Sequence, residues 1–172
     1  MKSGIKWEFV EAAGTFQKLP VGGYVLKIKS VKNNDERKYL EIVYDIAEGE
    51  YKGFYASEDD WRHTFRKYYN EASQRFFKKF LVALETSNSN FDLAKWSETE
   101  DEQEFVGLLI GGLIQERYYT SEKDGQDKTA LEVADIADIF EIRGGFYKLP
   151  EPRDNRIKKD AFTDTYDDIP FN

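Results

Sequence analysis

The amino-acid sequence predicts a mainly β protein with a helical insertion: three strands, a helix, and then two more strands. Apolar and polar residues alternate over residues 21–31 and 39–46, which is the pattern of strands with one buried face. Apolar residues recur at helical spacing between Asn70 and Ser87, which predicts the insertion. The length of 172 residues suits one domain with appendages.

The first half of the chain is predicted to hold an N-terminal arm over residues 1–20 and three strands. In the first strand, Leu26 and Ile28 share one face, while Lys27, Lys29 and Val31 share the other. The apolar face of the second strand consists of Leu40, Ile42, Tyr44 and Ile46. A turn with two glycines leads to a short third strand at residues 54–57.

Two helices are predicted in the middle of the chain. Asp59 or Asp60 is expected to cap a helix that carries Trp61, Phe65 and Tyr68 at i, i+4 and i+7. Asn70 is expected to cap the second helix, whose apolar stripe consists of Ser73, Phe77, Phe80, Leu81 and Leu84. The Ser-Asn-Ser-Asn run at residues 87–90 ends this helix, and we expect an acidic loop at residues 97–105.

The second half is predicted to form a long hairpin and a tail. The strand over residues 105–119 contains three glycines, which are typical of a bulge or bend where a sheet curls. Asp124-Gly125 is a hairpin signal, and the return strand covers residues 129–142. From Pro150 the composition is that of a disordered tail, so we divide the chain into a domain at 1–149 and a flexible tail at 150–172.

This order of elements fits the five-stranded OB barrel, which binds oligonucleotides on one strand face and two loops. An α+β sandwich could give the same order of elements. The chain has no cysteine and a single histidine, so thiolate sites and multi-histidine metal centres within one chain are excluded, and we expect no metal and no cofactor. No signal peptide or apolar membrane span is visible, which predicts an intracellular, cytoplasmic protein.

The charge of the chain is unevenly distributed. The formal net charge is −8, which taken alone argues against a nucleic-acid partner. However, residues 97–105 hold five acids and the last thirteen residues hold four, with no base in either segment. The remainder is close to neutral and can carry a basic face.

Cations and aromatic residues gather in the expected binding regions. Single-strand binding needs cations for the phosphates and free rings on which bases stack. The predicted phosphate contacts are Lys27, Lys29, Lys32, Arg37, Lys38, Arg62, Arg66, Lys67, Lys123 and Lys128. The predicted ring contacts are Tyr39, Tyr55, Trp61 and Tyr119. A tyrosine on a strand is more often core or half-buried packing than a stacking surface, and the lysines of the first strand could form a solvated face.

Five residues near the end of the tail suit docking to a partner protein. Acidic Asp167 and Asp168 precede Ile169, Pro170 and Phe171. We expect Phe171 to fill an apolar pocket, Pro170 to limit the freedom of the peptide, and the acids to meet a basic rim. The acids could also compete with DNA for a basic groove, most strongly at low salt.

This ending resembles the tails of bacterial single-stranded DNA-binding proteins, which finish Asp-Asp-Asp-Ile-Pro-Phe and recruit replication, recombination and repair proteins. Here Asn172 follows the phenylalanine. The body is similar to phage-type single-stranded DNA-binding proteins of Gram-positive hosts in Pro20-x-Gly-Gly-Tyr24, in residues 44–53, and in the stretch from Phe105 to Pro150. The resemblance implies an OB fold, no enzyme activity, and a role in a phage or mobile element.

Two other hypotheses stay open at this point. The protein could be an interaction module that binds no DNA and docks residues 167–171 into a host replication or repair factor. It could also be a metal-dependent nuclease, because Glu50-Tyr51-Lys52 resembles half of such a site. The sequence shows no self-association signature, although a homo-oligomer is compatible with it.

Overall fold

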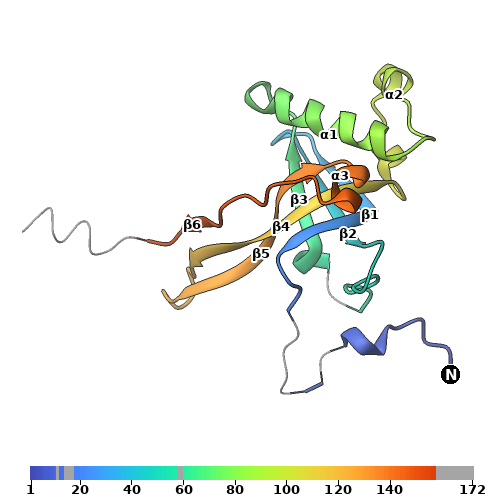
Figure 1. The fold of residues 1–172 in the computed structure, drawn as a ribbon. Coiled ribbons are helices and arrows are strands. Elements are labelled where there is room, and N and C mark those ends of the chain that lie inside the picture. Colours follow the sequence, from blue (N-terminus) through green and yellow to red (C-terminus); the bar gives the residue numbers. More distant parts are fainter. Residues whose placement is uncertain (11, 14–17, 58–59, 158–172) are drawn as a thin grey trace, which may run out of the picture.

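The computed structural model describes residues 1–10, 12–13, 18–57 and 60–157. Within this part of the chain a six-stranded sheet and three α-helices form a mixed α/β fold (Figure 1). The strands are β1 Gly22–Asn34, β2 Tyr39–Ile46, β3 Thr64–Tyr68, β4 Leu109–Thr120, β5 Asp127–Ala137 and β6 Arg153–Asn155. The helices are α1 Gln74–Ser87, α2 Leu93–Thr99 and α3 Ile139–Gly144.

The sheet is open at its two edges. Its strands follow the order β3-β2-β1-β4-β5 with antiparallel neighbours, and β6 pairs with β4 in parallel. The described residues show no ladder between β3 and β5, so the closed five-stranded barrel expected from the sequence is not observed.

Strands β1 and β2 lie where the alternation predicted them, but a bulge changes one face of β1. The register shifts between Ile28 and Ser30, so Lys29 is the extra residue. The shift moves Val31 to the face of Ile28, and both side chains are buried in the core. The expectation that Val31 shares a face with Lys27 and Lys29 was therefore wrong, because one inserted residue inverts the alternation.

The third strand was predicted in the wrong place. Residues 54–57 form turns in which Phe54 and Tyr55 are buried, whereas β3 lies ten residues further along the chain. The helix expected to carry Trp61, Phe65 and Tyr68 is only a short 3-10 helix, Asp60–His63, followed by this strand. Phe65 and Tyr68 lie in β3, and the pairing of this strand with β2 replaces the expected helix.

Helix α1 was predicted correctly in its end and orientation but not in its start: it begins at Gln74, and Asn70 precedes a 3-10 helix, Glu71–Ser73, without a capping hydrogen bond from its side chain. Helix α1 ends at Ser87, and Phe80, Leu81 and Leu84 are buried on the side that contacts β3, β4 and β5. The acidic segment after it is not a plain loop. It contains the end of α2 and a 3-10 helix, Glu102–Phe105, because Trp96 and Phe105 bury their rings against each other while the acids stay outside.

The β4–β5 hairpin turns near Gly125 as predicted, and the register shifts between Leu113 and Ile114, close to the glycines of β4. The return strand was expected to reach residue 142 but stops at Ala137. Asp138 ends it by capping α3, because its carboxylate accepts hydrogen bonds from the backbone N–H groups of Phe140 and Glu141.

The chain does not leave the body at Pro150. The side-chain amide of Gln115 donates a hydrogen bond to the Pro150 carbonyl at 2.8 Å. Residues 153–155 then form β6 beside Arg117–Tyr119. Disorder predicted from composition was therefore wrong for this segment, because β4 extends past the end of β1 and leaves a backbone edge free for pairing.

Candidate nucleic-acid interface

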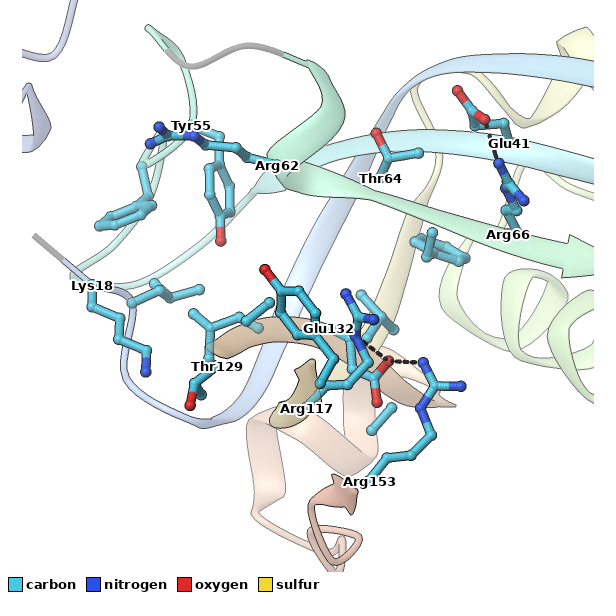
Figure 2. Close-up of a pocket in the computed structure, with 18 of the residues that line it drawn as sticks. Lys18, Glu41, Tyr55, Arg62, Thr64, Arg66, Arg117, Thr129, Glu132 and Arg153 are labelled. Atoms are coloured by element: carbon cyan, nitrogen blue, oxygen red, sulfur yellow. Dashed lines mark hydrogen bonds and ion pairs between the residues drawn. The ribbon is translucent and has the colours of Figure 1, made fainter. Parts of the chain in front are cut away.

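A groove of about 1170 Å³ lies between the edge strands β3 and β5 (Figure 2). One wall comes from β2, β3 and the segment before β3, and the other comes from β4, β5 and β6. Figure 2 shows Arg117 and Arg153 on one wall, where they meet at Glu132, and Arg62 and Arg66 along the other wall. The groove thus occupies the gap at which the sheet fails to close.

Positive charge dominates the groove. Its lining contains two carboxylates, Glu41 and Glu132. The cations that line it are Lys18, Arg62, Arg66, Arg117 and Arg153. A protein of net charge −8 therefore presents a locally positive cleft, and low-dielectric walls strengthen the field of such a cleft.

Several of these cations are held in place by ion pairs. Arg66 Nε lies 3.8 Å from a Glu41 oxygen, and Arg153 Nη2 donates to Glu132 Oε2 at 2.7 Å. Lys18 Nζ contacts Glu116 at 2.9 Å, and this hydrogen bond lowers the pKa of the Glu116 carboxyl. All of these pairs are at least partly exposed, so their cations remain accessible to an anionic ligand.

Two tyrosine rings lie beside the arginines. Tyr68 on β3 is 40 % exposed, and Tyr119 on β4 is half-buried, with the Arg117 guanidinium 4.8 Å from its ring centre. Tyr55 and Phe65 also line the groove but are almost completely buried. Accessible cations next to accessible rings are what phosphates and flat bases require.

The groove brings together only part of the residues predicted from the sequence. Four of them line it: Tyr55, Arg62, Arg66 and Tyr119. The lining does not include Lys27, Lys29, Lys32, Arg37, Lys38, Tyr39, Lys67, Lys123 or Lys128. The side chain of Trp61 and the tail residues Asp167, Asp168, Ile169, Pro170 and Phe171 lie outside the described part of the chain.

Two of the predicted stacking rings are packed against protein. Tyr39 and Tyr55 are each only 7 % exposed. The Arg66 guanidinium lies 4.5 Å from the Tyr39 ring centre, and the Tyr55 ring is stacked on His63 at 4.8 Å. Their surroundings favour packing over base stacking for both rings.

The predicted cations outside the groove fall on other surfaces. Lys27, Lys29 and Lys32 are exposed on β1, and Arg37 and Lys38 on the turn that follows it. Lys67 is half-buried, and burial lowers the pKa of its ammonium. Lys128 pairs with Asp124 at 3.1 Å near the tip of the hairpin.

Three cations of the groove were missed by sequence reasoning: Lys18, Arg117 and Arg153. A signal existed for Arg117, which alternates with Tyr119 on one face of the predicted strand. Arg153 lies in a segment expected to be disordered, and Lys18 in the arm. No local pattern connects those two residues to the sheet.

No known protein-family model matches the chain, and no curated protein is similar to it in sequence. Among the described residues, no helix is both long and apolar enough to cross a membrane. The same part of the chain contains no cluster of histidine, aspartate and glutamate side chains suited to holding a metal ion.

Proposed function

We propose that this protein binds single-stranded DNA without sequence preference and is not an enzyme. One observation carries the proposal: the groove between β3 and β5 places five cations beside the rings of Tyr68 and Tyr119. Cations follow the phosphates, and rings accept any base, so binding of this kind depends on salt and little on sequence.

The order of the strands supports an OB-type architecture. β1 pairs with β2 and β4, these pair with β3 and β5, and α1 follows β3 in the chain. An OB barrel is partly open, and it binds oligonucleotides beside strands 2 and 3. We propose that the β3–β5 groove is the gap of such a barrel.

The tail supplies the second part of the proposal. We infer that Asp167, Asp168 and the Ile-Pro-Phe sequence after them recruit replication, recombination or repair proteins in the cytoplasm of a host cell, as the resemblance to phage-type proteins implies. These residues are absent from the described part of the chain, so the sequence alone carries this inference.

Fluorescence anisotropy with labelled oligo-dT tests DNA binding. We expect binding at low salt that weakens steeply as salt rises, with a weaker signal for a duplex of the same length. The Asp167→Asn/Asp168→Asn variant of the full chain removes competition from the tail. If neither the wild type nor this variant binds oligo-dT at low salt, the proposal is wrong.

The same titration separates the rival functions. A protein that binds no DNA, but whose tail peptide captures a replication factor, would be an interaction module. Cleavage of labelled DNA in Mg²⁺ would indicate a nuclease. We expect no cleavage, since neither Glu50 nor Lys52 lines the groove and Tyr51 packs among the rings of Phe9 and Phe54.

A further inference from the structure

We infer that Arg117 and Arg153 form a phosphate-binding subsite, and that Glu132 occupies this subsite until a phosphodiester of the bound strand displaces its carboxylate. The inference rests on the proposed function, because it names the ligand chemistry of one end of the same groove. It adds a role for an acidic residue that is otherwise unexpected in an anion-binding cleft.

The three side chains come from three different strands and meet at one oxygen atom. Arg153 of β6 donates to Glu132 Oε2 at 2.7 Å, and Arg117 Nε of β4 lies 3.8 Å from the same oxygen (Figure 2). Two guanidinium groups around one anionic oxygen are the arrangement that binds a phosphate. The Glu132 carboxylate therefore stands where a phosphate oxygen would bind.

The ion pairs of Glu132 with Arg117 and Arg153 are suited to replacement by contacts with a phosphate. The Glu132 side chain is 22 % exposed and the Arg153 side chain 58 % exposed, so water and ligand can reach both. The contact with Arg117 is too long for a hydrogen bond. Partly exposed ion pairs of this kind contribute little to stability, so the cost of exchanging the carboxylate for a phosphate is small.

Arg153 is also on a short strand at the surface of the molecule. β6 has three residues, all exposed, and pairs with β4 only through residues 117–119. The Arg156–Asp154 ion pair lies within its own segment, and the backbone N–H of Ile157 donates to Thr120 Oγ1. Arg153 can therefore follow a phosphate without disturbing the core of the sheet.

A base-binding surface adjoins the subsite. The guanidinium of Arg117 lies 4.8 Å from the ring centre of Tyr119, and both groups line the groove. One nucleotide would place its phosphate between the two arginines and its base against the Arg117–Tyr119 pair. The ligand is therefore a single strand, whose bases are free to turn away from a helix.

The test removes the competing charge while keeping the shape of the side chain. We expect Glu132→Gln to raise the affinity for oligo-dT about 3- to 10-fold and to steepen the slope of log K against log salt by about 0.7, the increment for one added phosphate contact. Glu48→Gln is the matched control. It removes the same charge from an arginine ion pair outside the groove, with Arg143, and should change affinity less than about 2-fold.

Two further binding experiments show which groups are responsible for the gain in affinity. In an Arg117→Ala/Arg153→Ala background, Glu132→Gln should give no gain in affinity. With an abasic oligomer of the same length, the gain of Glu132→Gln should persist, because it depends on phosphates and not on bases.

Unchanged or weaker binding by a folded Glu132→Gln protein, with wild-type circular dichroism, would overturn the inference and make Glu132 a positioning residue for the arginines. A gain that survives loss of both arginines would also overturn it. In either case wild-type binding to oligo-dT leaves the proposed function standing. Failure of the wild type to bind would remove the function and the subsite together.

Discussion

Neighbouring tyrosines on β4 have different surroundings. Tyr119 lines the groove next to Arg117. Tyr118 points to the other side, where its hydroxyl donates to Glu116 at 3.1 Å and Arg156 lies 5.3 Å from its ring centre. Since successive side chains of a strand alternate between faces, the Tyr119 ring faces the groove and the Tyr118 ring does not.

Replacement of Tyr119 by alanine should weaken oligo-dT binding by about 1–3 kcal/mol, which is the usual value of one base–aromatic stack. Tyr118→Ala is the matched control and should leave affinity within about 0.5 kcal/mol of the wild type. Anisotropy titrations at one salt concentration measure both. Equal losses for the two variants would place the DNA elsewhere on the hairpin.

The sequence predicted part of this site at the level of residues. It identified Arg62, Arg66 and Tyr119, because cations beside aromatic residues are visible without a structure. It also nominated Tyr39, which is buried beneath Arg66 on the strand next to β3. Exposure depends on the neighbouring strand, and that neighbour was predicted in the wrong place.

Asn88 connects two elements that the sequence treated separately. Its side-chain amide donates to the carbonyls of Leu84 at 2.9 Å and Leu109 at 2.8 Å, and its Oδ1 accepts from the backbone N–H of Leu109 at 2.9 Å. The residue is buried, and it serves as hydrogen-bond partner to both the end of α1 and the start of β4. The sequence pattern predicts for it only a place in the run that ends a helix.

Asn88→Ala should lower the free energy of unfolding by about 2–4 kcal/mol, because three hydrogen bonds are lost and buried backbone groups lose their partner. Asn90→Ala, in the same run but exposed, should change it by less than about 0.5 kcal/mol. Urea denaturation of both variants provides the measurement. A near-neutral Asn88→Ala would mean that water replaces the amide.

Acidic and basic side chains lie on different surfaces of the molecule. The acids of residues 98–104 lie on α2, on the 3-10 helix after it and between the two, and none of them lines the groove. The exposed lysines of β1 lie on another surface that the sequence also favoured for DNA. Two cationic surfaces therefore compete as the binding face, and the salt dependence of binding can distinguish them.

Arg66→Ala should reduce the slope of log K against log salt by about 0.7, because one phosphate contact of a single strand is lost. Lys29→Ala should leave the slope unchanged if the groove is the binding face. Titrations at three or more salt concentrations give both slopes. The reverse result, with Lys29 controlling the slope, would move the DNA to the outer face of β1.

The sequence by itself determined β1, β2, α1 and the β4–β5 hairpin, because each follows from a pattern within about fifteen residues: alternation, helical spacing, or a turn dipeptide. Only the tertiary structure decided the position of β3, the pairing of β6 and the composition of the groove. The groove is lined by three arginines that are far apart in the chain: Arg66, Arg117 and Arg153. They line one groove because β6 pairs with β4, while β3 and β5 remain unpaired across the opening. That arrangement depends on hydrogen bonds between backbone segments that are far apart in the sequence, and a local sequence pattern does not predict such pairing.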